Sequence, residues 1–396
     1  MSGSLLRLAC TVAVAAQALC VPLPAAAAPE PAAPGERSVA RLLTDLQRLY
    51  REAERATESY NATEEKLRGQ RAEVRRLETA LGRARLSLHD SRAEAGRLAR
   101  QQYQSSTDIS PYVQLLLARD PQHALDQGHV IGQVARERAQ TVERLEKGER
   151  RADTLARQAR TAFDRQHALA EERRKQRDEV RGRLDDVERL LASLTAGQLA
   201  ELATFESKGI AKAQDTFMAS GALSSTARTP TGAGDRALRY AVRQLGKPYE
   251  WGAEGPASYD CSGLTSRAWA AAGTPIPRTS QEQWAELDRV ALDELRPGDL
   301  VVYFPEATHV ALYLGDGLVV QAPRPGAAVK VSPIAANPVL GAVRPDPGGT
   351  PLTAYTPPKL PAGARDGSDE GYASARSPKA VPPGRAGGRQ PETDSR

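Results

Sequence analysis

The sequence predicts an α+β domain that is preceded by a long antiparallel α-helical coiled coil. Residues 37–205 are rich in Arg, Glu, Ala, Leu, Gln and Asp, and their apolar residues recur at helical spacing. Residues 235–345 instead indicate helices followed by short strands rich in β-branched residues. The chain of 396 residues is long enough for two or three such units.

Residues 1–28 have the pattern of a secretory signal peptide. A basic residue precedes an apolar run over residues 8–23, and four consecutive alanines follow. The run is shorter than the ~20 residues that cross a bilayer. We expect cleavage near the end of the alanines, which removes Cys10 and Cys20 and leaves Cys261 as the one cysteine of a secreted protein.

The helical region 37–205 carries an apolar seam between charged positions. A single helix of this length would expose its seam, so two arms that cover each other are favoured. The seam residues are Val39, Leu42, Leu46, Leu49, Leu67, Val74, Leu77, Leu81, Val142, Leu145, Leu155, Val180, Leu184, Val187 and Leu191. Prolines near residues 105–130 predict a break where the chain folds back. The leucines of this break form either a docking surface or the small core of the turn.

Two segments have the composition of irregular chain. Residues 206–234 turn to Ser, Thr, Gly and Ala and predict a flexible linker. Residues 346–396 hold Pro, Gly, Ser and scattered charges with few large apolar residues, so we expect a disordered tail.

Within residues 235–345 the elements follow from start and stop signals. "RALRYAVRQLG" predicts a helix that ends at Gly246, and "CSGLTSRAWAAAG" predicts one that is capped by Asp260 and ends at Gly273. "GDLVVYF", "HVALYLG" and "LVVQAP" predict strands of an antiparallel meander.

Cys261 is a candidate nucleophile because it is expected in the first turn of a helix. The backbone N–H groups and the positive end of the helix dipole favour the thiolate there. The alternative is a small buried hydrophobic residue.

A nucleophilic thiol needs a base, and His309 is the only histidine of this domain. If "GDG" forms the hairpin turn, Leu314 faces Leu318 and Ala311 faces Gln321. His309 lies on the same strand face as Ala311, so Gln321 becomes its diagonal neighbour across the strands. The Gln321 amide can then accept a hydrogen bond from the ring and fix the tautomer.

Six motifs in order resemble the NlpC/P60 peptidoglycan endopeptidases: "QLGKPYEWG", "YDCSGL", "IPRTSQEQ", "RPGDLVVY", "HVALYLG" and "VVQAP". The resemblance implies a papain-like cysteine hydrolase that cuts stem peptides of the bacterial cell wall. It makes Cys261 the nucleophile, His309 the base and Gln321 the third polar residue. Many members carry histidine where Gln321 stands.

The resemblance also implies substrate-binding roles for Tyr249, Asp260 and Ser262. Tyr249 would lie near the oxyanion, while Asp260 and Ser262 would help to recognise the stem peptide. Each has a plainer interpretation: Tyr249 as a half-buried aromatic residue, Asp260 as an N-cap, and Ser262 as a first-turn residue bonded to its own backbone. Arg278 of "PRTS" could pair with a surface carboxylate.

The helical region is similar to that of secreted division-associated hydrolases with PcsB-like coiled coils. That similarity implies docking on a membrane complex of the FtsE/FtsX type and restraint of the enzyme until it is needed.

The predicted function is a secreted, cell-wall-associated peptidoglycan hydrolase, cutting the γ-D-glutamyl–diamino acid bond by Cys–His chemistry. The alternatives are a scaffold or regulator that acts through the coiled coil, and an amidase or acyl transferase that uses the same dyad. No cofactor or metal is implied. Nucleic acid is excluded as a partner, since a charge of +5 and an aromatic content of 5% come without a recognition motif.

Overall fold

The computed structural model describes residues 38–105, 113 and 121–364. The predicted signal peptide, most of the predicted break and residues 365–396 of the predicted tail lie outside these residues. No helix in the described part of the chain is long and apolar enough to cross a membrane.

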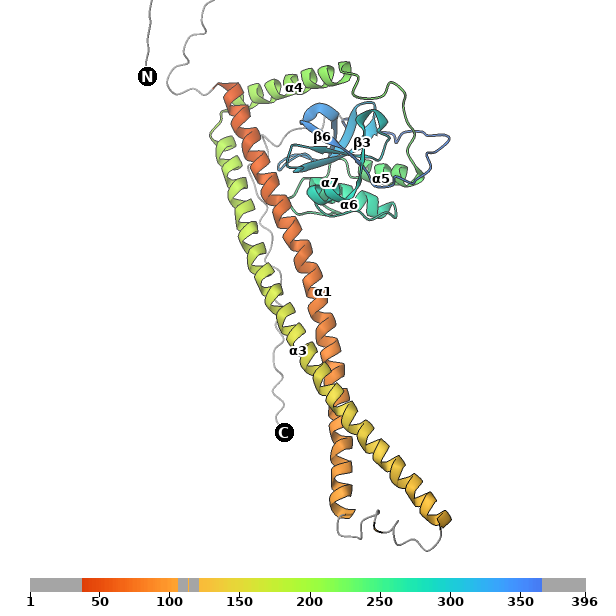
Figure 1. Ribbon diagram of the computed structural model, residues 1–396. Coiled ribbons are helices and arrows are strands. Elements are labelled where there is room, and N and C mark those ends of the chain that lie inside the picture. Colours follow the sequence, from red (N-terminus) through yellow and green to blue (C-terminus); the bar gives the residue numbers. More distant parts are fainter. Residues whose placement is uncertain (1–37, 106–112, 114–120, 365–396) are drawn as a thin grey trace, which may run out of the picture. The chain divides into compact units, whose positions relative to one another are not determined.

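Two long helices, α1 (Val39–Ser105) and α3 (Pro121–Ala192), confirm the predicted helical arms. They run antiparallel, since Glu52 of α1 pairs with Arg183 and Glu94 pairs with Arg144 (Figure 1). Apolar clusters join them along the seam, and their buried members on α1 and α3 are Leu42, Leu43, Leu46, Tyr50, Val187 and Leu191, then Val74, Leu77 and Ala162, then Ala84, Leu88 and Ala152.

A third helix, α4 (Ala196–Ala219), corrects the predicted linker, because residues 206–219 continue it. Its N-terminus has a capping box between Thr195 and Gln198. Ala, Lys and Gln keep the helix propensity high as far as Ala219, and the Ser- and Thr-rich composition begins only after it.

The remaining elements form one antiparallel sheet with helices beside it (Figure 1). Its strands lie in the order β1-β6-β2-β3-β4-β5. They are β1 (Asp288–Val290), β2 (Leu300–Tyr303), β3 (His309–Gly315), β4 (Leu318–Gln321), β5 (Lys330–Pro333) and β6 (Val339–Arg344). The helices are α5 (Gly232–Val242), α6 (Cys261–Ala271) and α7 (Ser280–Glu286), with short 3-10 turns at Leu292–Glu294 and Ile334–Ala336.

The two faces of the sheet bury different clusters, as the alternation along a strand requires. Leu300 and Val302 of β2 join the core that contains α5 and α6. Val301 and Tyr303 join a second core, and Phe217 of α4 packs against it. Helix α4 is therefore part of the packing around the sheet.

Residues 346–364 correct the predicted start of the disordered tail. The Leu352 N–H donates to the carbonyl of Pro230 at 2.8 Å, and the Val331 N–H donates to the carbonyl of Ala364 at 3.0 Å. These backbone bonds hold the segment against the domain. Few apolar side chains are needed for this, which is why composition alone missed it.

Candidate active site

Cys261 is the first residue of α6, as the sequence predicts. The Asp260 carboxylate caps the helix by accepting the Gly263 N–H at 2.6 Å. Gly263 has no substitute here, because a Cβ would lie 2.2 Å from the carbonyl oxygen of Ala253. This turn fixes the thiol in a buried position, 3% exposed.

His309 begins β3 and Gln321 ends β4, and the two side chains meet. Leu312 faces Val320, which continues the predicted register. The prediction for Leu318 was wrong: a bulge at the turn places it opposite Gly315. The Nε2 atom of His309 lies 2.6 Å from Oε1 of Gln321. An amide oxygen only accepts, so Nε2 carries the proton and the free lone pair of the ring is on Nδ1.

The His309 ring is neutral at pH 7, because burial lowers its pKa to about 4. Its Nδ1 lies 3.7 Å from Oε1 of Glu54 on α1. That distance alone would suggest an ion pair. The neutral ring excludes one at neutral pH.

Asp260 and Ser262 are both held by Arg278. The guanidinium donates to the two Asp260 oxygens at 3.1 and 2.7 Å, and to Ser262 Oγ at 2.8 Å. Arg278 is 8% exposed, and its Nε also pairs at 3.1 Å with Glu254, a carboxylate that is 30% exposed, so a pairing with a carboxylate near the surface is one of its contacts. The Asp260 N-cap is confirmed, and the same carboxylate also anchors this cation.

Sequence reasoning missed Arg278 and Ser280 as members of this cluster. Both belong to "IPRTSQEQ", where Thr279 caps α7 in a capping box with Glu282. The motif carries part of the family resemblance, and its Thr-x-x-Glu capping pattern is typical of a helix that starts at Ser280. This pattern is the sequence feature that could have placed Ser280 at the start of α7.

Tyr249 is 6% exposed and lies in the same apolar core cluster as Cys261, so it is more buried than a half-buried aromatic residue. Its pKa is raised well above the ordinary value, first by burial and then by Cys261 and Asp260. Its backbone N–H donates to the Ala327 carbonyl at 2.9 Å. The phenol is thus neutral beside the Cys261 thiol, and its contact with an oxyanion stays a prediction.

Helix α1 covers this cluster. Oε1 of Glu58 accepts from Ser262 Oγ at 2.8 Å and lies 3.9 Å from the Cys261 sulfur. Oε2 of Glu58 accepts from the Ser280 N–H at 2.7 Å and from its hydroxyl at 2.9 Å. The Asn61 amide donates to Asp260 at 3.1 Å. In this closed arrangement Cys261, Ser262 and Asp260 are buried under α1.

The closed arrangement reverses one expectation about the thiol. The helix start predicts a favoured thiolate, yet the pKa of Cys261 is raised well above its ordinary value. Burial is the largest cause, followed by the charges of Glu58, Asp260 and Glu54. The thiol is therefore protonated while α1 covers it.

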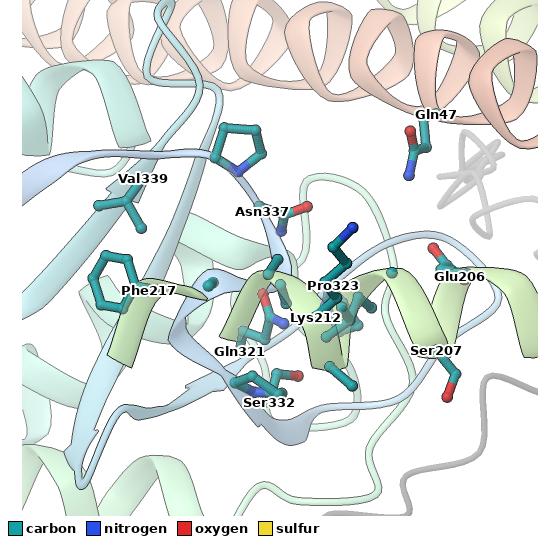
Figure 2. Close-up of a pocket in the computed structure, with 18 of the residues that line it drawn as sticks. Gln47, Glu206, Ser207, Lys212, Phe217, Gln321, Pro323, Ser332, Asn337 and Val339 are labelled. Carbon is teal, nitrogen blue, oxygen red and sulfur yellow. The ribbon is translucent and has the colours of Figure 1, made fainter. Parts of the chain in front are cut away.

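A cavity of about 1290 Å³ lies on the Gln321 side of the cluster, between α1, α4 and the edge of the sheet. Figure 2 shows Gln47, Lys212, Gln321 and Ser332 among the residues that line it. Its wall includes Glu54, and the described residues that line it include neither Cys261 nor His309. The cavity therefore ends short of the thiol.

Comparison with known proteins identifies the domain. Residues 246–341 match the model of the NlpC/P60 family. A probable endopeptidase of Corynebacterium glutamicum is 51% identical over 79 residues, which are 20% of this chain and 38% of the relative. A probable endopeptidase of Mycobacterium tuberculosis is 41% identical over 108 residues, 26% of this chain and 28% of the relative.

Solved structures give similar matches. An NlpC/P60 family protein from Bacillus cereus is 31% identical with a TM-score of 0.28, covering 29% of this chain and 41% of that one. The NlpC/p60 domain of the peptidoglycan hydrolase SagA is 30% identical with a TM-score of 0.27, covering 28% and 97%. The curated relatives are thus matched over little more than a third of their length at most. Residues 246–341 form a domain of the NlpC/P60 family.

Proposed function

We propose that this chain is a secreted, cell-wall-associated peptidoglycan endopeptidase of the cysteine type, acting in wall remodelling or division. The family match and the relatives named as probable endopeptidases support a peptidase. The observation that carries the proposal is the site itself. A thiol starts a capped helix that packs against the strand of a buried histidine, and Gln321 fixes the tautomer of that histidine.

The proposed reaction uses these groups in two steps. Nδ1 of His309 takes the proton of Cys261, and the sulfur attacks a stem-peptide carbonyl to form a tetrahedral oxyanion. The imidazolium returns the proton to the leaving amine, which departs as the thioester forms. Water, activated by the same nitrogen, then releases the acid and restores the thiol. Backbone N–H groups at the start of α6, with Tyr249, would stabilise the oxyanion.

A carboxylate subsite beside the thiol supports cleavage next to γ-D-glutamate. Ser262 and Ser280 donate three hydrogen bonds to the Glu58 carboxyl group in the closed arrangement. A γ-linked glutamyl residue offers a free carboxylate close to the bond that is cut. The bond between γ-D-glutamate and the diamino acid therefore suits this subsite.

The helical region is proposed to connect the enzyme to a membrane complex of the FtsE/FtsX type. This part rests on the resemblance of the helical arms. A partner that moves α1 would uncover Cys261 and His309, both of which are buried in the closed arrangement.

The test is muropeptide mass spectrometry on purified sacculi. One sample receives residues 222–364, a range that keeps the strand-like contacts around Thr231 and Pro351, and a second receives its Cys261→Ala variant. Fragments that end at glutamate, absent with the variant, support the endopeptidase. Free lactyl groups would mean an amidase, and unchanged sacculi with a folded domain would mean a scaffold.

A further inference from the structure

One segment of α1 buries polar side chains where the rest of the helix buries apolar ones. Within residues 53–63 the buried polar residues are Glu54, Thr57, Glu58, Asn61 and Thr63. Glu54, Glu58 and Asn61 are spaced by four and three residues, so they share one helix face. This face contacts the site through His309, Ser262 and Asp260.

Glu58 brings a carboxylate next to another carboxylate. The Asn61 amide lies 3.4 Å from Glu58 Oε1 and 3.1 Å from Asp260 Oδ2, and so bridges the two acids. Burial and the charge of Asp260 raise the pKa of Glu58 to about 7, although Arg278 and the bonds from Ser280 and Ser262 act the other way.

Glu54 has weaker support. Its Oε1 lies 3.7 Å from His309 Nδ1, and its Oε2 has no hydrogen-bond partner among the described residues. Burial and the charge of Glu58 raise its pKa to about 8. An ionised carboxylate in such a place would be costly, whereas a protonated one is tolerated.

The cations that face this pair are already engaged or exposed. Arg278 is bonded to Asp260 through both terminal nitrogens. Arg324 makes a two-bond pair with Glu206 of α4, at 2.8 and 3.0 Å. Arg51, the remaining cation that acts on Glu54, is exposed on α1. The cluster therefore contains more acid than base.

We propose that Glu54 and Glu58 form a proton-dependent latch, which holds α1 over Cys261 and His309 when the pair is protonated and releases it when the pair ionises. The role of the covered site rests on the proposed function, but the latch itself does not require catalysis. Two acids that share a helix face enter the cleft together and must leave it together.

The sign of the pH dependence follows from the groups in the cleft. Both glutamates have raised pKa values in the closed state, so their contribution to docking is complete below about 4.5 and is lost as pH rises through about 7 and 8. His309 acts oppositely, but only between about 4 and 6.5. The thiol acts in the same direction as the glutamates, at higher pH. Above pH 6.5 the glutamates therefore dominate the pH dependence of docking. Each weakens the docking equilibrium by about tenfold per pH unit until the pH reaches the pKa of that glutamate in the closed state.

Amide hydrogen exchange tests this without substrate. The Ser280 N–H donates to Glu58 and reports docking, whereas the Gly263 N–H donates to Asp260 and is the internal reference. In the full native chain, protection of the Ser280 amide relative to Gly263 should fall at least about tenfold from pH 6.5 to 8.5. In Glu54→Gln/Glu58→Gln it should change less than about twofold, because the side-chain amides do not ionise in this range.

An equal change in the native chain and the double variant would overturn the latch, as would constant protection in the native chain. Glu78→Gln, an exposed position on the same helix, is the matched control and should behave as native. If the double variant does not fold, Glu54→Gln alone keeps the Glu58 bonds and should lose part of the pH dependence. Because no substrate is used, inactivity on sacculi would refute the proposed function and leave this result standing.

Discussion

Two stretches of the same helix use opposite kinds of contact. Between Val74 and Leu88, α1 buries apolar side chains against Ala162 and Ala152 of α3. Between Glu54 and Asn61, it buries carboxyl and amide groups against the cluster of Cys261, Ser262 and Asp260. The first contact gains from removing apolar surface from water, and it is independent of pH.

The polar stretch is a poor choice for permanent packing and a good one for a contact that must open. Buried acids lose hydration and regain it only through a few hydrogen bonds. When α1 leaves, water can satisfy Glu58, Ser262 and Ser280 again. The comparison teaches that polar burial in an otherwise apolar seam marks a reversible closure.

Removing an apolar contact should give the largest loss of stability. Leu77→Ala takes a buried side chain from the seam, and we expect the free energy of unfolding to fall by about 2–5 kcal/mol. Glu58→Ala should cost less than ~1 kcal/mol, because its partners become hydrated when α1 moves away. Urea unfolding followed by circular dichroism compares the two. If Glu58→Ala lowered the free energy of unfolding more than Leu77→Ala, the contrast between the apolar and the polar stretch of α1 would be wrong.

Gln321→Ala should distinguish an effect on the His309 ring from an effect on the covering of the site by α1. Without the bond to Nε2, His309 loses its fixed tautomer, and hydrolysis should fall about 10- to 100-fold. The factor should be the same in the native chain and in Glu54→Ala/Glu58→Ala, since the amide acts on the ring and not on α1. Gln321→His should restore most of the rate. Unequal factors in the two backgrounds would show that Gln321 also supports the closed state.

The smallest effect is expected from the exposed rim of the polar stretch. Arg55 pairs with Glu306 at 2.8 Å, but both side chains are more than half exposed. Arg55→Ala should therefore weaken docking by less than ~1 kcal/mol, with little change in Ser280 exchange. If Arg55→Ala changed Ser280 exchange as much as Glu58→Ala does, the closed arrangement would depend on surface charge and not on the buried acids.

The sequence predicted the site where its signals were local. Asp260 before Cys261 predicted a capped helix. The predicted hairpin register placed Gln321 next to His309, and the bulge at the turn did not change this pairing. The cover on the site was not predicted, because a helix pattern does not say which element its polar face meets. The signal was a gap: none of the seam residues predicted from the sequence lies between Leu49 and Leu67.

The predicted linker over residues 206–219 and the predicted start of the tail were wrong for related reasons. The linker prediction extended the Ser- and Thr-rich composition that follows Ala219 back to residues 206–219, which belong to α4. Contacts with the sheet hold this part of α4, and in one of them the Gln214 amide donates to the Gly317 carbonyl at 3.0 Å. Residues 346–364 are held by backbone bonds, which leave little trace in side-chain composition.

The most direct test of the closure is the initial rate of stem-peptide cleavage in sacculi at pH 7 by the full native chain and by Glu54→Ala/Glu58→Ala. The rate should follow the fraction of molecules whose site is open, so the double variant should be at least about tenfold faster. Glu78→Ala should match the native chain. A double variant that is as slow as the native chain, while residues 222–364 cleave rapidly, would contradict the assignment of the closure to these two glutamates.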